Sequence, residues 1–345
     1  MPKRDLVVIG GSAGALEVLQ QFARALPENF QAAILIVIHT SSHAGSLLPE
    51  IISRAGKLRA VHPSDGTLIE KGNIYIAPPD FHMIIEGDRL RVLQGPKENL
   101  HRPAIDPTFR SAAAYYGPRT IGVIVSGMLD DGTSGMMVIR AAGGETVVQD
   151  PHEAMFAAMP QHALEQVPDS RVIKIAELAG LLGTLTTEEV EAPTVQNNAA
   201  ISAAIKEIRL AETNMAEIED EHRIGKPSSL ACPDCGGVLW EIDQEGLLRF
   251  RCRVGHAFTA RHLETEQRHA VEGALWAALR ALEESASLYR RMAQRAKTAK
   301  HVSLFDQYEE RAENKEQNAR TLRDFLVAVN TQQVEDSQIV ESESA

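Results

Sequence analysis

Three unbroken apolar runs, each followed by a helical pattern, constrain the fold of this 345-residue chain more than any other feature. The runs are DLVVI at 5–9, AAILIVI at 32–38 and RTIGVIV at 119–125. Continuous rather than alternating hydrophobicity indicates strands that are covered on both faces. Because helical segments follow each run, the pattern predicts an α/β fold with a doubly wound, mostly parallel, Rossmann-like sheet. The expected helices cover residues 16–26, 47–55 and 133–142.

Shorter strand-like segments at 72–78, 82–86 and 89–93 interrupt this alternation. Gly87 and Asp88 separate the last two, which predicts an antiparallel hairpin with a two-residue turn. We therefore expect a first domain of residues 1–190, in which an antiparallel hairpin decorates the parallel sheet.

The alternation of strand-like and helical segments ends at about residue 190. Residues 191–227 contain apolar side chains at helical spacing from Ile201 to Ala211 and are predicted to be a helical linker. Residues 261–330 contain two long helical patterns, broken near 300–303, which predict a C-terminal helical hairpin. Residues 331–345 have four acids and no bases, so we expect a disordered acidic tail.

The three cysteines, Cys232, Cys235 and Cys252, fall within one short stretch, which excludes a disulfide framework. Cys232 and Cys235 form a C-x2-C turn, and Cys252 is followed four residues later by His256. Two such turns can complete a tetrahedral Cys3His set, so residues 228–260 are predicted to be a small zinc ribbon with a structural zinc ion. A hairpin over 239–242 and 247–251 would join the turns. His262 is an alternative fourth ligand.

Gly10–Gly14 reads GGSAG and lies between a predicted strand and a predicted helix. It matches G-x-S-x-G, which in that context is typical of a nucleophile elbow. A Gly-rich turn before a helix can also hold phosphate, although the dinucleotide fingerprint G-x-G-x-x-G would need glycines at Ser12 and Ala15. The motif alone leaves both interpretations open.

A histidine and an acid follow two other predicted strands. His39 comes directly after the second run, and Asp130 and Asp131 come shortly after the third. The carboxyl ends of parallel strands meet at one edge of a sheet, so these side chains are expected beside Ser12. Serine, histidine and aspartate are the components of a nucleophilic hydrolase site, in which the histidine takes the serine proton and the acid orients the histidine.

Six segments, in order, resemble the catalytic domain of CheB, the family of chemotaxis protein-glutamate methylesterases. The resemblance covers about residues 4–190. It implies that Ser12 is the nucleophile, that His39 is the base and that Asp131 is the orienting acid, because the family pattern G-M-x-x-D-G begins at Gly127. The segments are VVIGGSAGALEVL, VIHTSSHAGSLLPEII, IYIAPPDFHMII, HRPAIDPTFRSAA, GVIVSGMLDDGTSGM and VVQDPHEAMFAAMPQHAL.

The same resemblance places Ala13 and Met128 at the site. The family usually has threonine where Ala13 stands, but the backbone N–H of Ala13 can still serve an oxyanion hole. The implied reaction is hydrolysis of glutamate methyl esters on receptor helices or other signalling proteins, with glutamine deamidation by the same steps and no cofactor for catalysis. Arg102, like Arg110, could pair with acids beside the target residue, or could be paired inside its own domain.

Net charge and the length of the apolar stretches exclude two classes of protein. A formal net charge of −12 argues against a nonspecific nucleic-acid binder, and no apolar stretch approaches the ~20 residues of a membrane span, so we expect a cytoplasmic protein. The family's archetype carries an N-terminal receiver domain. We expect no receiver domain in this chain, and the part that follows residue 190 is a candidate site for a regulatory partner. The alternatives are a noncatalytic signalling adaptor with the same fold and a nucleotide-binding domain.

Overall fold

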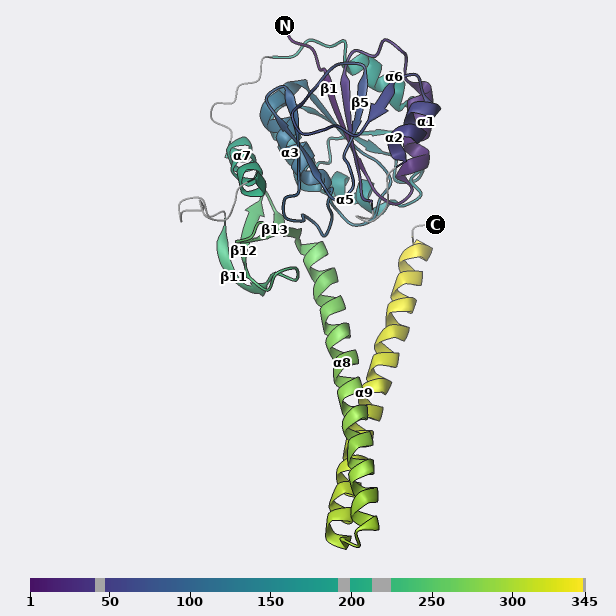
Figure 1. The fold of residues 1–345 in the computed structure, drawn as a ribbon. Coiled ribbons are helices and arrows are strands. Elements are labelled where there is room, and N and C mark those ends of the chain that lie inside the picture. Colours follow the sequence, from purple (N-terminus) through teal and green to yellow (C-terminus); the bar gives the residue numbers. More distant parts are fainter. Residues whose placement is uncertain (41–46, 192–198, 213–224, 344–345) are drawn as a thin grey trace. The chain divides into compact units, whose positions relative to one another are not determined.

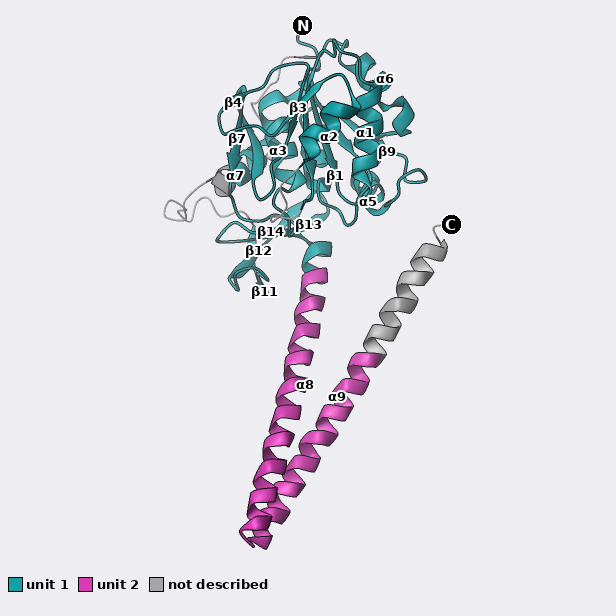
Figure 2. Ribbon diagram, turned by 45° about the vertical axis from the view of Figure 1, so that its right-hand side comes forward, with its two compact units in different colours: residues 1–263 teal, residues 264–345 magenta. Residues whose placement is uncertain are grey.

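The computed structural model describes residues 1–40, 47–191, 199–212 and 225–343. The chain divides into two compact units, Met1–Leu263 and Glu264–Ala345 (Figure 2). Much of the predicted linker, residues 192–198 and 213–224, lies outside the described residues.

The first unit is built on a seven-stranded sheet in which every neighbouring pair is parallel. This confirms the α/β fold with a parallel sheet. The three predicted apolar runs supply its central strands. A fourth strand, at 73–76, was expected only as a short segment near the hairpin but pairs in parallel with its neighbours. In sheet order the strands are β10 (Arg171–Ile173), β9 (Glu145–Gln149), β8 (Thr120–Ile124), β1 (Leu6–Gly11), β2 (Ala33–Ile38), β5 (Asn73–Ile76) and β3 (Arg59–Val61).

Helices cover both faces of this sheet, as Figure 1 shows for α1 and α3. The side chains of β1 alternate between two cores: Val7 and Ile9 pack with α1, α2 and α6, whereas Leu6 and Val8 pack with α3, α4 and α5. Burial on both faces explains why the strand is continuously apolar. The helices are α1 (Ala15–Ala25), α2 (Leu48–Ala55), α3 (Ile105–Tyr116), α4 (Thr133–Ala141), α5 (Ala158–Gln166) and α6 (Ile175–Leu185), with a short 3₁₀ helix at Gly117–Arg119.

The predicted antiparallel hairpin is present as β6 (His82–Glu86) and β7 (Arg89–Leu93). Gly87 in its turn has φ of 63°, a left-handed conformation that favours glycine. A short strand, β4 (Thr67–Leu68), extends the hairpin to three strands and was not predicted.

A second, antiparallel sheet follows α7 (Ala199–Glu212), which packs on α3. The predicted hairpin of the cysteine-containing segment is present within this sheet. The sheet belongs to the first compact unit, and its last strand pairs with Glu98 through Ala257. Its strands are β11 (Lys226–Ala231), β12 (Val238–Gln244), β13 (Leu247–Cys252) and β14 (Ala257–Thr259).

Two long helices, α8 (Ala260–Thr298) and α9 (Val302–Glu343), supply the second unit. They pack together through Leu279 of α8 and Ala319 and Leu326 of α9. The break between them falls beside the predicted position. However, residues 331–343 are helical where a disordered tail was expected, because Glu and Gln disfavour a helix little once the preceding turns exist. Within the described part of the chain, every helix is too short or too polar to cross a membrane.

Candidate active site

Ser12 lies in the turn between β1 and α1, at the carboxyl edge of the parallel sheet. Its backbone N–H donates to the Ser126 carbonyl at 2.9 Å, which ties the turn to the end of β8. Gly14 begins the helix with φ of 74°. A Cβ on Gly14 would lie only 2.7 Å from Ser126 Oγ, so the turn needs glycine for both its conformation and its close packing.

His39 follows the neighbouring strand, one residue beyond the pair Gly11 and Ile38 in the β1–β2 register. Ser12 and His39 therefore emerge from adjacent strands at the same edge. The His39 side chain is 6% exposed, and its Nε2 lies 2.7 Å from Asp131 Oδ2. Its Nδ1 is buried and has no hydrogen-bond partner among the described residues, which leaves this nitrogen available as a base.

Asp131 is fully buried and accepts five hydrogen bonds. Oδ2 accepts from His39 Nε2 and from the Ile105 N–H, both at 2.7 Å. Oδ1 accepts from Asn99 Nδ2 at 2.8 Å and from the N–H groups of Asp106 and Gly132 at 3.3 and 3.0 Å. Burial opposes its ionisation, but the hydrogen bonds and the charge of His39 hold the Asp131 pKa well below its usual range. Asp131 is thus an ionised acceptor that fixes the Nε2–H tautomer of His39.

A second buried acid, Asp106, lies next to this carboxylate. It accepts from Asn99 Nδ2 at 3.0 Å and from the Gly135 N–H at 2.7 Å. Burial, followed by the negative charge of Asp131, raises the pKa of Asp106 to about 7. Asp131 therefore holds its negative charge more strongly than Asp106 does, and Asp131 is the carboxylate that faces His39.

Two further histidines lie near His39. The His101 ring stacks on His39 with centroids 3.6 Å apart and planes 12° apart, and His262 meets His101 edge-on at 6.4 Å. Burial, followed by the neighbouring His39, lowers the pKa of His101 to about 3, so this ring stays neutral. His262 is fully buried beside Asp130, with Nδ1 2.8 Å from Asp130 Oδ1, and is not part of the cysteine cluster. The prediction of His262 as an alternative fourth metal ligand was therefore wrong.

The loop after β8 also approaches Ser12. A Cβ on Gly127 would lie 3.1 Å from Ser12 Cβ and 2.7 Å from Met159 Sδ, so only glycine fits there without displacement. The next residue, Met128, is 56% exposed. Met155 and Phe156 are also exposed and lie close to Gly14, so exposed apolar side chains flank the turn that carries Ser12.

Both arginines considered for substrate contact are paired within the domain. Arg102 donates from Nε and Nη2 to Asp80 Oδ1, at 2.9 and 2.7 Å, and from Nη1 to the Gly95 carbonyl. Arg110 is 1% exposed and forms ion pairs with Glu98 and Glu207. Arg110 cannot reach an external substrate, because the packing of α7 and the second sheet covers it.

The three cysteines and His256 gather at one point of the second sheet, with all ligand atoms within 4.8 Å of one another. Cys235 Sγ lies 3.7 Å from Cys252 Sγ, and His256 Nδ1 lies 3.5 Å from Cys252 Sγ and 3.7 Å from Cys232 Sγ. Around one tetrahedral zinc ion, two thiolates would be about 3.8 Å apart and a thiolate and an imidazole nitrogen about 3.6 Å apart. The donor set and its spacing fit such an ion.

A buried ion cluster joins this sheet to the parallel-sheet domain. Arg251 of β13 donates to Glu98 and to Glu207 of α7, each at 2.8 Å, and Arg249 donates to Glu207 at 2.7 and 2.9 Å. Arg110 completes the cluster, and all five side chains are at most 4% exposed. Arg249 and Arg251 therefore contact protein.

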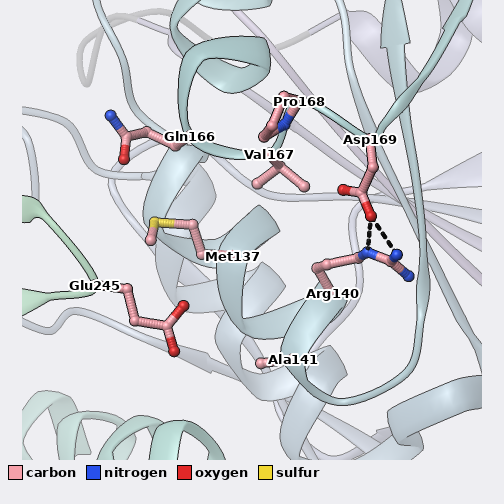
Figure 3. A pocket seen from close by; sticks show the side chains of 8 residues that line it. All are labelled: Met137, Arg140, Ala141, Gln166, Val167, Pro168, Asp169 and Glu245. Atoms are coloured by element: carbon pink, nitrogen blue, oxygen red, sulfur yellow. Dashed lines mark hydrogen bonds and ion pairs between the residues drawn. The ribbon is translucent and has the colours of Figure 1, made fainter.

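A separate cavity of about 290 Å³ lies between α4, the end of α5 and the β12–β13 turn (Figure 3). Arg140 and Asp169 on its wall form an ion pair, and Glu245 reaches it from the turn. None of the predicted catalytic or metal-binding residues lines this cavity.

Sequence reasoning missed Asn99, Ser126, Thr259 and the role of His101. Ser126 donates from Oγ to the Ala13 carbonyl and accepts from the Phe156 N–H, so it joins three loops at the site. Its position directly after a predicted strand was a usable signal. Asn99 and Thr259 carried none, because their importance depends on which distant segments meet.

A parallel sheet with a serine in its first turn and a buried His–Asp pair beside it defines an α/β domain of the serine-hydrolase class. The profile of the CheB methylesterase family matches residues 7–182, just over half of the chain. The chain belongs to this family.

Individual proteins to which the chain is similar belong to the same family. A protein-glutamate methylesterase/protein-glutamine glutaminase of Paramagnetospirillum magneticum is 35% identical over 180 residues, which cover 51% of this chain and 47% of that protein. A relative from Leptospira interrogans, named for the same two activities, is 32% identical over 188 residues, which cover 54% of this chain and 97% of the relative. The crystal structure of the Thermotoga maritima CheB methylesterase catalytic domain aligns with a TM-score of 0.50 and 30% identity, over 52% of this chain and 98% of that domain.

Proposed function

We propose that this protein hydrolyses glutamate methyl esters on signalling proteins, with Ser12 as nucleophile, His39 as general base and Asp131 as the acid that orients His39. One observation carries the assignment: Asp131 fixes the proton of His39 on Nε2, which leaves the buried Nδ1 free to accept a proton. Membership of the CheB methylesterase family supports the same chemistry.

The reaction follows from these roles. Ser12 Oγ attacks the γ-carbonyl carbon of the ester while its proton moves to His39 Nδ1, and Asp131 stabilises the imidazolium. The backbone N–H of Ala13 donates a hydrogen bond to the developing oxyanion, together with the backbone at Met128. Methanol leaves with the proton from His39, and a water molecule deprotonated by the same nitrogen then releases glutamate. Glutamine deamidation uses the same steps with ammonia as the leaving group.

The substrate is a methylated helix of a receptor or another signalling protein. The exposed apolar side chains of Met128, Met155 and Phe156 surround the serine and suit a helix with apolar residues near its target glutamate. Because Arg102 is held by Asp80, a substrate acid would have to share that arginine rather than find it free.

We further propose a structural zinc ion on Cys232, Cys235, Cys252 and His256, in a ribbon that spans residues 228–260. All four tetrahedral positions would be filled by protein, so the ion would stabilise the ribbon and take no part in ester hydrolysis. The helical hairpin at 261–330 is the proposed contact for a regulatory partner in the cytoplasm.

Methanol release from a methylated receptor fragment tests the activity. We expect turnover by the intact protein, loss of turnover in Ser12→Ala, and covalent labelling of Ser12 by a serine-directed phosphonate that is absent in the same variant. Ser64→Ala is a matched control, because it removes an exposed hydroxyl in the loop between β3 and β4. Turnover that survives Ser12→Ala would overturn the assignment, and a folded wild-type protein without turnover or labelling would favour the adaptor.

A further inference from the structure

The segment that follows the metal-binding turn lies against the loop that carries Asp131. This segment, residues 257–262, is outside the part of the chain that matches the family profile. The Asn99 N–H donates to the Ala257 carbonyl at 2.8 Å, and the Thr259 N–H donates to Asn99 Oδ1 at 2.9 Å. Asn99 Nδ2 in turn donates to Asp131 Oδ1 at 2.8 Å. Strand β14 therefore fixes an amide that holds the orienting carboxylate.

The same segment also holds Asp130, the residue before Asp131. Thr259 Oγ1 donates to Asp130 Oδ1 at 2.7 Å, and His262 Nδ1 lies 2.8 Å from the same oxygen. The three side chains are at most 3% exposed. Burying a carboxylate is costly in free energy unless polar groups contact it. The Thr259 hydroxyl and the His262 ring supply such contacts to Asp130 Oδ1, and Arg261 Nε lies 4.0 Å from Asp130 Oδ2.

The two contacts converge on the catalytic base. Asp131 is held on one side through Asn99 and along the backbone through Asp130, and the His262 ring meets edge-on the His101 ring that stacks on His39. The segment thus limits the movement of both His39 and the acid that orients it.

We propose that Thr259 and His262 are positioning residues of the esterase, which hold Asn99 and Asp130 and through them set the geometry of Asp131 and His39. This inference rests on the proposed function. It makes the second sheet and the start of α8 part of the working active site rather than an appended module. A displacement of about 1 Å at a reacting group can reduce a rate by about 100-fold, so a lost contact behind Asp131 has a measurable effect.

Two pairs of variants test the proposal. Thr259→Val keeps the shape but removes the hydroxyl, whereas Thr259→Ser keeps it. His262→Leu removes the ring nitrogen that lies 2.8 Å from Asp130 Oδ1, whereas the amide nitrogen of His262→Asn is expected to take the position of Nδ1. We expect kcat to fall about 10- to 100-fold in Thr259→Val and His262→Leu with KM changed less than about twofold, and kcat to stay within about threefold of wild type in the two conservative variants.

A spectroscopic readout separates positioning from general destabilisation. The downfield proton resonance of the His39–Asp131 hydrogen bond is expected to shift or broaden in Thr259→Val and His262→Leu and to remain in Thr259→Ser and His262→Asn, with metal content unchanged in all four. Near-wild-type kcat with an unchanged resonance in Thr259→Val would overturn the proposal, as would a gain in kcat, since the segment would then restrain the enzyme. Failure of the proposed function is distinguished by an inactive wild type, and the resonance still tests the positioning.

Discussion

Replacing Asp131 by asparagine probes the site most directly. The carboxylate accepts two hydrogen bonds on Oδ2 and three on Oδ1, and all five donors are fixed by the fold. Asparagine provides one acceptor oxygen and one NH2 group. The amide oxygen is best placed on the side with three donors, so the NH2 group would face His39 Nε2 and the Ile105 N–H.

Two consequences follow, with separate magnitudes. The Ile105 N–H loses its acceptor, which costs about 1–3 kcal/mol in the free energy of unfolding. His39 can accept from the NH2 group only by moving its proton to Nδ1, so the nitrogen that should take the Ser12 proton is then blocked. The negative charge that stabilises the imidazolium is also lost. By analogy with serine hydrolases in which this change traps the wrong tautomer, we expect kcat to fall about 10⁴-fold, or about 5 kcal/mol in activation free energy.

The assay is methanol release under saturating substrate, together with urea unfolding of the same preparation. Asp150→Asn is the control, because Asp150 follows β9 at the same sheet edge and, among the described residues, its side chain accepts only from the nearby His152 N–H. It is expected to retain wild-type kcat. If Asp131→Asn were to keep kcat within tenfold of wild type while folded, Asp131 would not be the orienting acid.

Three further outcomes are expected. Removing the metal with a chelator, or by Cys235→Ser, is expected to release one equivalent of zinc and lower the melting temperature; an unchanged melting temperature with the metal gone would contradict a structural ion. Glu98→Gln removes the negative charge between Arg110 and Arg251 and replaces one acceptor oxygen by an NH2 group, although both arginines still pair with Glu207, and it is expected to cost about 3–5 kcal/mol in urea unfolding. Asp169→Asn, in an exposed pair, is expected to cost less than about 1 kcal/mol; equal costs would refute the buried cluster. Burial lowers the pKa of His101 to about 3, so between about pH 6.5 and 3 the unfolded chain binds a proton that the folded protein excludes, and stability falls as pH falls. In His101→Phe that loss is expected to be shallower by up to about 1.4 kcal/mol per pH unit; parallel pH profiles would argue against the buried neutral ring.

Local sequence patterns predict much of the fold and of the candidate site. The three apolar runs predicted the central strands because each strand is buried on both faces and must be apolar along its length. The G-x-S-x-G turn, His39 after the second strand and the acids after the third were visible for the same reason, since chain direction and strand order bring their ends to one edge. The spacing of the cysteines and His256 likewise reflects two tight turns that each supply two ligands.

Other features depended on which distant segments meet. Asp130 and Asp131 are adjacent in the sequence, and only their surroundings differ: one faces His39, whereas the other faces Thr259 and His262. Arg251 is enclosed by α7 and Glu98, which are far from it in the sequence.

The sequence by itself therefore determined the parallel sheet, the edge at which Ser12 and His39 emerge, and the residues of the Cys3His cluster, because each follows from periodicity or spacing within a short stretch. Only the tertiary structure decided that β14 and the start of α8 lie behind Asp131. That contact is made by hydrogen bonds between residues as far apart as Asn99 and Thr259, and no local pattern in either segment encodes the other.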